Sequence, residues 1–292
     1  MPKSVALVPT RKAAAAARAQ WDEIVTLWLH ARPESTCLIY APVIQHFRLW
    51  LGDKPMAQIS LKDLQDYAVS FFHQKPRTVA RKLCTVKSLL TFAQKVGLIP
   101  FNVGGALRLP KIPNNLAEKI LDAKDIKRMI RLEPERRNQV LLRVLYGAGI
   151  RASEAAGLRW MDLQQRKTGG QITVLGKGAK TRSILLSEKT WNSLQSIRPP
   201  DAQPEGPVFV SREGSGLRRT TISVIVRKAA EGAGLEAKVS AHWMRHGHAT
   251  HALDAGTELT VIARTLGHES IVTTTRYLHA RPNQSSATSL GV

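Results

Sequence analysis

Apolar residues recur at intervals of three and four positions along most of this chain, which predicts a mainly α-helical protein. The first third of the chain is expected to form four helices, over residues 19–31, 36–51, 60–73 and 77–96. Turn-forming residues such as Pro33, Gly52 and Pro76 separate these helices. The helix over 77–96 has the clearest periodicity, with an apolar stripe made of Val79, Leu83, Val86, Leu90 and Ala93.

The opposite side of that helix carries Arg77, Arg81, Ser88 and Lys95. A basic, hydroxyl-bearing face of this kind can lie in a DNA groove and reach phosphates and base edges. It can equally be a solvated surface face, and the periodicity alone does not separate the two interpretations.

The rest of the chain is expected to be mostly helical with a small sheet inserted in it. Two β-rich runs, 171–175 and 181–186, flank a Gly-Lys-Gly turn and predict a hairpin. Helices are expected near residues 122–132, 135–147, 188–197, 218–233, 243–255, 258–266 and 270–278.

A segment rich in Gly, Pro and Asn divides the chain into two expected domains. We expect an all-helical domain over 1–107, a linker over 108–117, and a mostly helical domain with the β-hairpin over 118–292.

Charge narrows the choice of partner. The chain holds 43 Lys and Arg against 22 Asp and Glu, a formal net charge of +21. Residues 1–115 hold 16 against 6, or +10, and the remainder 27 against 16, or +11, so both halves are basic. A folded chain with such a field typically binds a polyanion, and nucleic acid is the favoured partner.

The sequence gives no sign of a membrane span, a disulfide framework or a cysteine zinc site. No stretch approaches about 18 consecutive apolar residues, so no membrane span is expected. The two cysteines, Cys37 and Cys84, are too few for a disulfide framework or a cysteine zinc site. With no signal peptide expected, we predict a cytoplasmic, nucleoid-associated protein.

Two segments carry candidate basic groups near a break in the helices. Arg151 follows a glycine-rich break, and Glu154 lies three residues later, where it can bind the local backbone or the guanidinium. An ordinary helix N-terminus has the same pattern. Lys177 lies in the glycine-flanked hairpin turn and can reach across a cleft, although a solvated turn lysine looks the same.

A histidine-rich segment holds His242, Arg245, His246, His248 and His251. The spacing of the first two histidines, i and i+4, suits a zinc site, but a cation replaces the carboxylate of the HExxH pattern. Histidine beside arginine better suits an anion that undergoes reaction, so no metal is expected.

The last informative segment runs from Leu266-Gly267-His268 to Tyr277. Arginine and histidine can bind the non-bridging oxygens of a phosphodiester and stabilise a pentavalent transition state. A tyrosine hydroxyl can attack the phosphorus, provided that a base or a cationic pocket assists, since its ordinary pKa is about 10. A lysine can protonate the leaving 5′ oxygen, and no cofactor is needed.

This order of motifs closely resembles the tyrosine recombinase/integrase family, and the Xer-like bacterial and phage members look nearest. The resemblance implies that Arg151 and Arg245 bind the phosphate, His268 donates a hydrogen bond to it, and Tyr277 forms a 3′-phosphotyrosyl link. It also implies that Lys177 is the general acid, with Lys180 as the fallback. The remaining implied roles are an acid/base partner of the tyrosine at His242, a supporting group at Glu154, and DNA contacts at Lys180 and Arg182.

The sequence departs from the family at two places. Gly247 and His248 stand where the family often has Thr and Phe, so His248 is either structural or a further phosphate contact. Pro282 and a Ser-rich tail argue against a long terminal helix that docks on a neighbouring subunit.

The function expected is site-specific DNA recombination through covalent cleavage and rejoining, on double-stranded DNA carrying a recombination site. The resemblance also implies a homotetramer on two DNA duplexes. The alternatives are a catalytically silent DNA-binding regulator on the same scaffold and, third, a metal-dependent nuclease.

Overall fold

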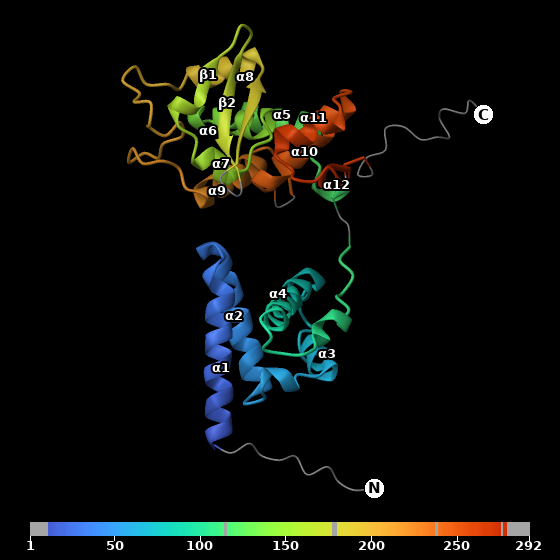
Figure 1. Ribbon diagram of the computed structural model, residues 1–292. Helices are drawn as coiled ribbons and strands as arrows, with labels where there is room; N and C mark the ends of the chain where they lie inside the picture. Colours follow the sequence, from blue (N-terminus) through green and yellow to red (C-terminus); the bar gives the residue numbers. More distant parts are fainter. Residues whose placement is uncertain (1–10, 114–115, 177–179, 237–238, 276, 279–292) are drawn as a thin grey trace, which may run out of the picture. The chain divides into compact units, whose positions relative to one another are not determined.

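The protein is described here from a computed structural model, which describes residues 11–113, 116–176, 180–236, 239–275 and 277–278. The chain divides into two compact units, Met1–Asn114 and Asn115–Val292, and each is described by itself (Figure 1). The division falls inside the segment 108–117, where the sequence predicts a linker.

The first unit is all-helical among its described residues. Its helices are α1 (Arg11–His30), α2 (Glu34–Leu51), α3 (Leu61–Val69) and α4 (Pro76–Lys95), with short 3-10 turns η1 (Met56–Gln58) and η2 (Val103–Ala106). The apolar stripe of α4 is buried in the core of this unit, as the periodicity predicts. Burial of this stripe leaves the basic side of α4 facing outward.

Helix α3 is shorter than the sequence suggests. Ser60 begins it with a reciprocal capping box, in which its hydroxyl accepts from Asp63 N–H and the Asp63 carboxylate accepts from Ser60 N–H. The helix ends at Val69, where Ser70 Oγ donates to the carbonyl of Tyr67 at 2.7 Å. A side chain that binds the backbone in this way competes with helix continuation.

The second unit packs its helices around α6, which is buried on nearly all sides. Its helices are α5 (Ala123–Leu132), α6 (Arg136–Gly147), α7 (Ala152–Ala156), α8 (Glu188–Gln195), α9 (Arg219–Gly232), α10 (Ala241–Asp254), α11 (Leu259–Leu266) and α12 (Val272–Thr275), with short turns η3 (Ala117–Lys119) and η4 (Trp160–Asp162). Val140, Leu141, Leu142, Val144 and Leu145 of α6 are each at most 1% exposed. Helices α7, α8 and α10 therefore pack directly against α6.

A small antiparallel sheet lies beside these helices. Strands β2 (Gly170–Leu175) and β3 (Thr181–Leu186) form the predicted hairpin, with Leu175 opposite Thr181. A third strand, β1 (Leu163–Gln165), pairs with β2, and the sequence analysis missed it because three residues are too short to show an alternation. The expected mainly helical fold with a small inserted sheet is confirmed.

Two expected features lie outside the described residues. These are the hairpin turn that carries Lys177 and the terminal segment with Pro282. Of the expected helix over 270–278, α12 is the part that is helical among the described residues, and Tyr277 and Leu278 lie in a turn. Within the described residues, no helix is long and apolar enough to cross a membrane.

Candidate active site

The first element of the site is a buried carboxylate that binds two arginines. Gly149 has a φ of +61°, which turns the chain sharply before α7, and Arg151 is the residue that precedes this helix. Glu154, in the first turn of α7, accepts from the backbone N–H and from Nη1 of Arg151, both at 2.8 Å. Its oxygens also accept from Nη1 and Nη2 of Arg182 on β3, at 2.9 and 2.8 Å.

Glu154 is ionised in this network, although its side chain is only 3% exposed. Burial acts to raise its pKa, but the hydrogen bonds from Arg182 and Arg151 and the charge of Arg182 outweigh it, and the net pKa lies below the ordinary value. The carboxylate therefore fixes both guanidinium groups before any ligand is present.

Arg245 is the most buried charged side chain of the site. It projects from α10, is 1% exposed, and donates from Nη1 to the carbonyl of Gly149 at 2.7 Å and from Nη2 to that of Leu266. Burial lowers its pKa to about 10, with a further contribution from the charge of Arg151, so the guanidinium stays protonated at neutral pH.

The C-terminal end of α11 binds two of these arginines. Carbonyls in the last turn of a helix have no partner within the helix and carry partial negative charge. Leu266 O accepts from Arg245, and the neighbouring Thr265 O accepts from Nε of Arg182 at 2.7 Å. Gly267 then ends the helix in the left-handed conformation, with a φ of +64°, and directs the chain into His268.

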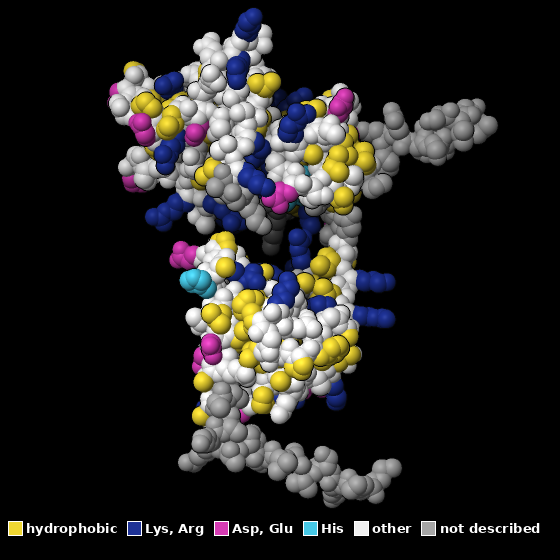
Figure 2. All heavy atoms as spheres, in the orientation of Figure 1, with side chains coloured by type: hydrophobic (Ala, Val, Ile, Leu, Met, Phe, Trp, Pro, Cys, Tyr) yellow, Lys and Arg dark blue, Asp and Glu magenta, His cyan; other side chains and the backbone are white. Residues whose placement is uncertain are grey.

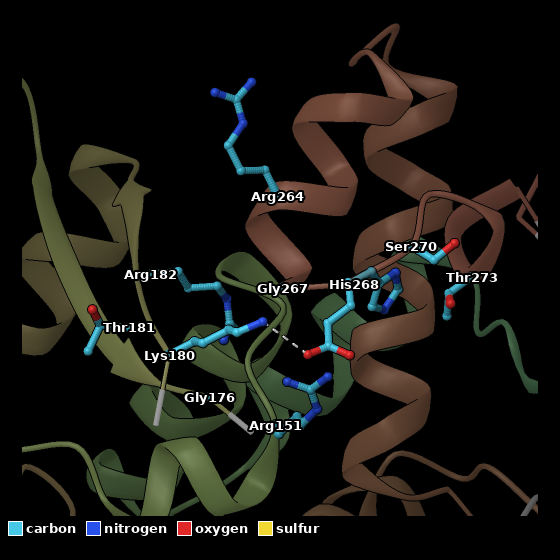
Figure 3. Close-up of a pocket in the computed structure, with 11 residues that line it drawn as sticks. Arg151, Gly176, Lys180, Thr181, Arg182, Arg264, Gly267, His268, Ser270 and Thr273 are labelled. Atoms are coloured by element: carbon cyan, nitrogen blue, oxygen red, sulfur yellow. Dashed lines mark hydrogen bonds and ion pairs between the residues drawn. The ribbon is translucent and has the colours of Figure 1, made fainter. Parts of the chain in front are cut away.

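His268 lies in a pocket between β3 and the α11–α12 turn (Figure 3). Its Nδ1 shares a hydrogen bond of 2.7 Å with Thr274 Oγ1. The pocket has a volume of about 540 Å³, and its lining includes the basic residues Arg151, Lys180, Arg182 and Arg264. Arginine, lysine and histidine side chains therefore converge from separate elements on one concave, electropositive site.

Tyr277 lies in a buried position next to the histidines of α10. It is 2% exposed and packs with Leu266 and Ala249 in a small apolar cluster. Its hydroxyl shares a hydrogen bond of 2.8 Å with Nδ1 of His246, and the ring of His242 lies edge-on to that of His246 at 4.2 Å between centroids.

His246 is the site residue that the sequence analysis missed as a functional group. The spacing of His242 and His246 on one helical face indicates only a metal site, and the neighbouring Arg245 argues against that interpretation. Among the described residues, no group of three or more His, Cys, Asp or Glu is arranged to hold a metal ion.

His248 contacts the framework of the site. Its Nδ1 donates to the carbonyl of Tyr146 at 2.8 Å, and its ring lies where a Cβ on Gly149 would meet it at 2.6 Å. Burial lowers the pKa of His248, which favours the neutral ring. Of the two interpretations left open for this residue, the contacts favour the structural one.

The remaining sequence candidates are distributed as follows. Lys177 lies outside the described residues, and Lys180 forms an ion pair of 3.3 Å with Glu269. Arg182 is held inside the protein, with a side chain 12% exposed.

In the first unit, Arg77, Arg81 and Lys95 are exposed along α4, whereas Ser88 accepts a hydrogen bond from Arg32 Nη2 at 3.2 Å. Lys and Arg side chains are spread over both units in Figure 2, consistent with the even division of charge.

Comparison with known proteins identifies the class. Residues 119–284 match the model of the phage integrase family. The tyrosine recombinase XerC of Brucella suis biovar 1 is 30% identical over 292 residues, which cover 93% of this chain and 92% of the relative. The tyrosine recombinase XerC of Xanthomonas campestris pv. campestris (strain B100) is 30% identical over 236 residues, covering 78% and 72%.

Solved structures agree on the fold. A lambda integrase (75-356) dimer bound to a COC′ core site is 16% identical, with a TM-score of 0.74 and coverage of 93% of this chain and 97% of that one. XerH bound to its difH substrate is 21% identical, with a TM-score of 0.64 and coverage of 80% and 70%.

The family match and the XerC relatives identify the chain as a DNA strand-breaking and rejoining enzyme. The chain belongs to the phage integrase family of tyrosine recombinases. It is a site-specific recombinase, and DNA is its partner.

Proposed function

We propose that this recombinase cleaves DNA through a covalent 3′-phosphotyrosine at Tyr277. The observation that carries the proposal is the convergence of Arg151, Lys180 and His268 on one pocket, with Arg245 anchored to the end of α11 that precedes His268. A cluster of fixed cations and hydrogen-bond donors is the arrangement that stabilises a phosphorane-like transition state.

In the proposed reaction, Arg151 and Arg245 bind the non-bridging oxygens of the scissile phosphate, and His268 donates a further hydrogen bond. The Tyr277 oxygen attacks phosphorus as its proton passes to a histidine of α10, His242 or His246, and the P–O5′ bond breaks. The leaving 5′ oxygen takes a proton from Lys177, or from Lys180 as the fallback. Rejoining reverses these steps with a 5′ hydroxyl from another strand.

Two residues take supporting roles in this scheme. Glu154 orients Arg151, because it accepts from both the side chain and the backbone of that residue. Arg182 orients Glu154 and the end of α11 rather than DNA, because its Nε, Nη1 and Nη2 all donate within the protein.

The buried position of Tyr277 has a consequence for this mechanism. A hydroxyl on a residue that is 2% exposed cannot contact a phosphate on DNA. The segment that carries Tyr277 therefore has to move when DNA binds, and this movement is part of the proposal.

We further propose that the first unit, over 1–107, is a DNA-clamping domain joined through 108–117 to the catalytic domain over 118–292. Its exposed basic residues on α4 would contact the backbone of the same duplex. A homotetramer on two duplexes bearing a recombination site, acting at the nucleoid, completes the proposed assembly.

The test is covalent trapping on nicked DNA. The wild type and Tyr277→Phe are incubated in EDTA with a genomic library of nicked duplexes and separated by denaturing electrophoresis. A protein–DNA adduct in the wild type, absent from Tyr277→Phe, is the expected result. If Tyr277→Phe forms the adduct, or the wild type never does, the proposed chemistry is wrong, and the latter outcome favours a silent DNA-binding regulator.

A further inference from the structure

One acidic residue lies among the cations of the pocket. Among the described residues that line the pocket, Glu269 is the only carboxylate, against Arg151, Lys180, Arg182 and Arg264. Its Oε1 lies 3.3 Å from Nζ of Lys180, an ion pair that joins the start of β3 to the α11–α12 turn (Figure 3, dashed line).

The position of Glu269 is unfavourable for the phosphate that the pocket is proposed to bind. Glu269 and the preceding residue, His268, both line the pocket in which a phosphate is expected to bind. A carboxylate repels a phosphate and competes with it for the same lysine. Because the Glu269 carboxylate weakens phosphate binding, its role in the pocket is not to bind the phosphate.

The exposure of the pair indicates that it can be displaced. Both side chains are 75% exposed, and ion pairs between exposed side chains are weak. DNA presents a row of phosphates and gains from the release of many counterions at once. An isolated anion offers one contact and has no such advantage.

We propose that Glu269 is an internal competitor for phosphate that makes the pocket selective for DNA over isolated anions. In the DNA-free protein it holds Lys180 and lowers the affinity of the pocket for a single phosphate group. When a duplex binds, its phosphate takes Lys180 and Glu269 is displaced towards solvent. This inference rests on the proposed function, because it takes the pocket as the site of the DNA phosphate.

The test measures binding in a chain that cannot form a covalent adduct. In full-length Tyr277→Phe protein, the affinity for a fluorescent duplex of arbitrary sequence is measured by anisotropy over a range of salt concentrations. Competition by inorganic phosphate is measured in parallel. Variants of this chain carry Glu269→Gln, Lys180→Gln or both.

Glu269→Gln is expected to tighten duplex binding about two- to fivefold at low salt. It is also expected to make the salt dependence steeper, because the duplex no longer has to displace an anionic side chain that stays beside its phosphates. A lower concentration of inorganic phosphate should displace half of the duplex from this variant than from the Tyr277→Phe protein with Glu269 intact. In the Lys180→Gln background, the gain from Glu269→Gln should disappear.

Glu231→Gln is the matched control, because Glu231 is also an exposed carboxylate paired with an arginine, Arg227, at 3.7 Å, but on α9 outside the pocket. The inference is overturned if Glu269→Gln binds no tighter than Glu231→Gln, or if its gain persists undiminished without Lys180. Failure of the covalent test above would leave these binding differences intact, so the two proposals fail separately.

Discussion

The hydroxyl of Tyr277 and Nδ1 of His246 lie 2.8 Å apart, and both residues are 2% exposed. A hydrogen bond between buried groups contributes to stability, so this contact holds the end of the described chain against α10. The same hydroxyl is the proposed nucleophile, and its release from His246 is one cost of reaching a phosphate.

His246→Leu is therefore expected to lower the free energy of unfolding by about 1 kcal/mol, because the hydrogen bond to Tyr277 can no longer form. Tyr277→Phe should have a similar cost, and the double variant should cost less than the sum of the two, because both changes remove the same hydrogen bond. Urea unfolding measures the cycle. His246→Asn, which can place an amide near the position of Nδ1, is the control and should recover part of the stability; fully additive costs would contradict a shared bond.

Glu154→Gln is expected to destabilise the second unit by about 3 kcal/mol, because two guanidinium groups lose their buried counter-charge. The pKa of Glu154 is lower in the folded than in the unfolded protein. Its contribution to stability is therefore present above its ordinary pKa of 4.5 and is lost as pH falls through the lower folded value. Acid titration of unfolding should show a weaker pH dependence in this variant, whereas Glu231→Gln should behave like the wild type.

His248 gives a different pH window. Its pKa is lowered in the folded protein, so below about 6.5 the unfolded chain binds a proton that the folded chain does not. Stability should fall as pH decreases from 6.5. His248→Asn, which can keep a donor towards Tyr146 O, should lose less stability between pH 7 and pH 5 than the wild type, as followed by urea unfolding at each pH. Equal losses would contradict a lowered pKa of His248 in the folded protein.

Gly149→Ala tests the turn that supports Arg245. A Cβ here would meet the ring of His248 at 2.6 Å, in a backbone conformation with a φ of +61°. The conformation alone costs about 1–2 kcal/mol in a non-glycine residue. Gly256→Ala is the matched control, because its φ is +84° and no atom lies within 4 Å of the added Cβ. Gly149→Ala should be the less stable of the two and should also reduce covalent adduct formation, since Gly149 O holds Arg245.

The basic face of α4 is tested by its salt dependence. Exchange of Arg77, Arg81 and Lys95 for Gln should make the log–log salt dependence of duplex binding shallower by about 0.9 for each phosphate that the protein no longer neutralises. Lys62→Gln is the control in the same unit, because Lys62 is exposed on α3 and paired with Asp66. An unchanged slope would favour the alternative of a solvated face.

The features that could be predicted from the sequence are those that depend on local periodicity and on spacing within one element. The stripe of α4 follows from contacts within one helix, and the Arg151–Glu154 pair follows from three-residue spacing at a helix start. The hairpin follows from two β-rich runs around a glycine turn.

The interactions that escaped prediction join residues far apart in the chain. His246 and Tyr277 are 31 positions apart, and Arg182 and Glu154 are 28 apart, so no local pattern encodes either contact. The family resemblance implies a DNA contact at Arg182, and nothing in the local sequence indicates its partners within the protein. Only the packing of β3 against α7 and α11 reveals its buried partners.

The last turn of α11 mechanically couples three groups of the site. Its two terminal carbonyls bind Arg182 and Arg245, and the residue after its glycine end is His268. A shift of this one helix would therefore displace all three groups together, so a movement of α11 changes the site as a whole rather than one side chain at a time.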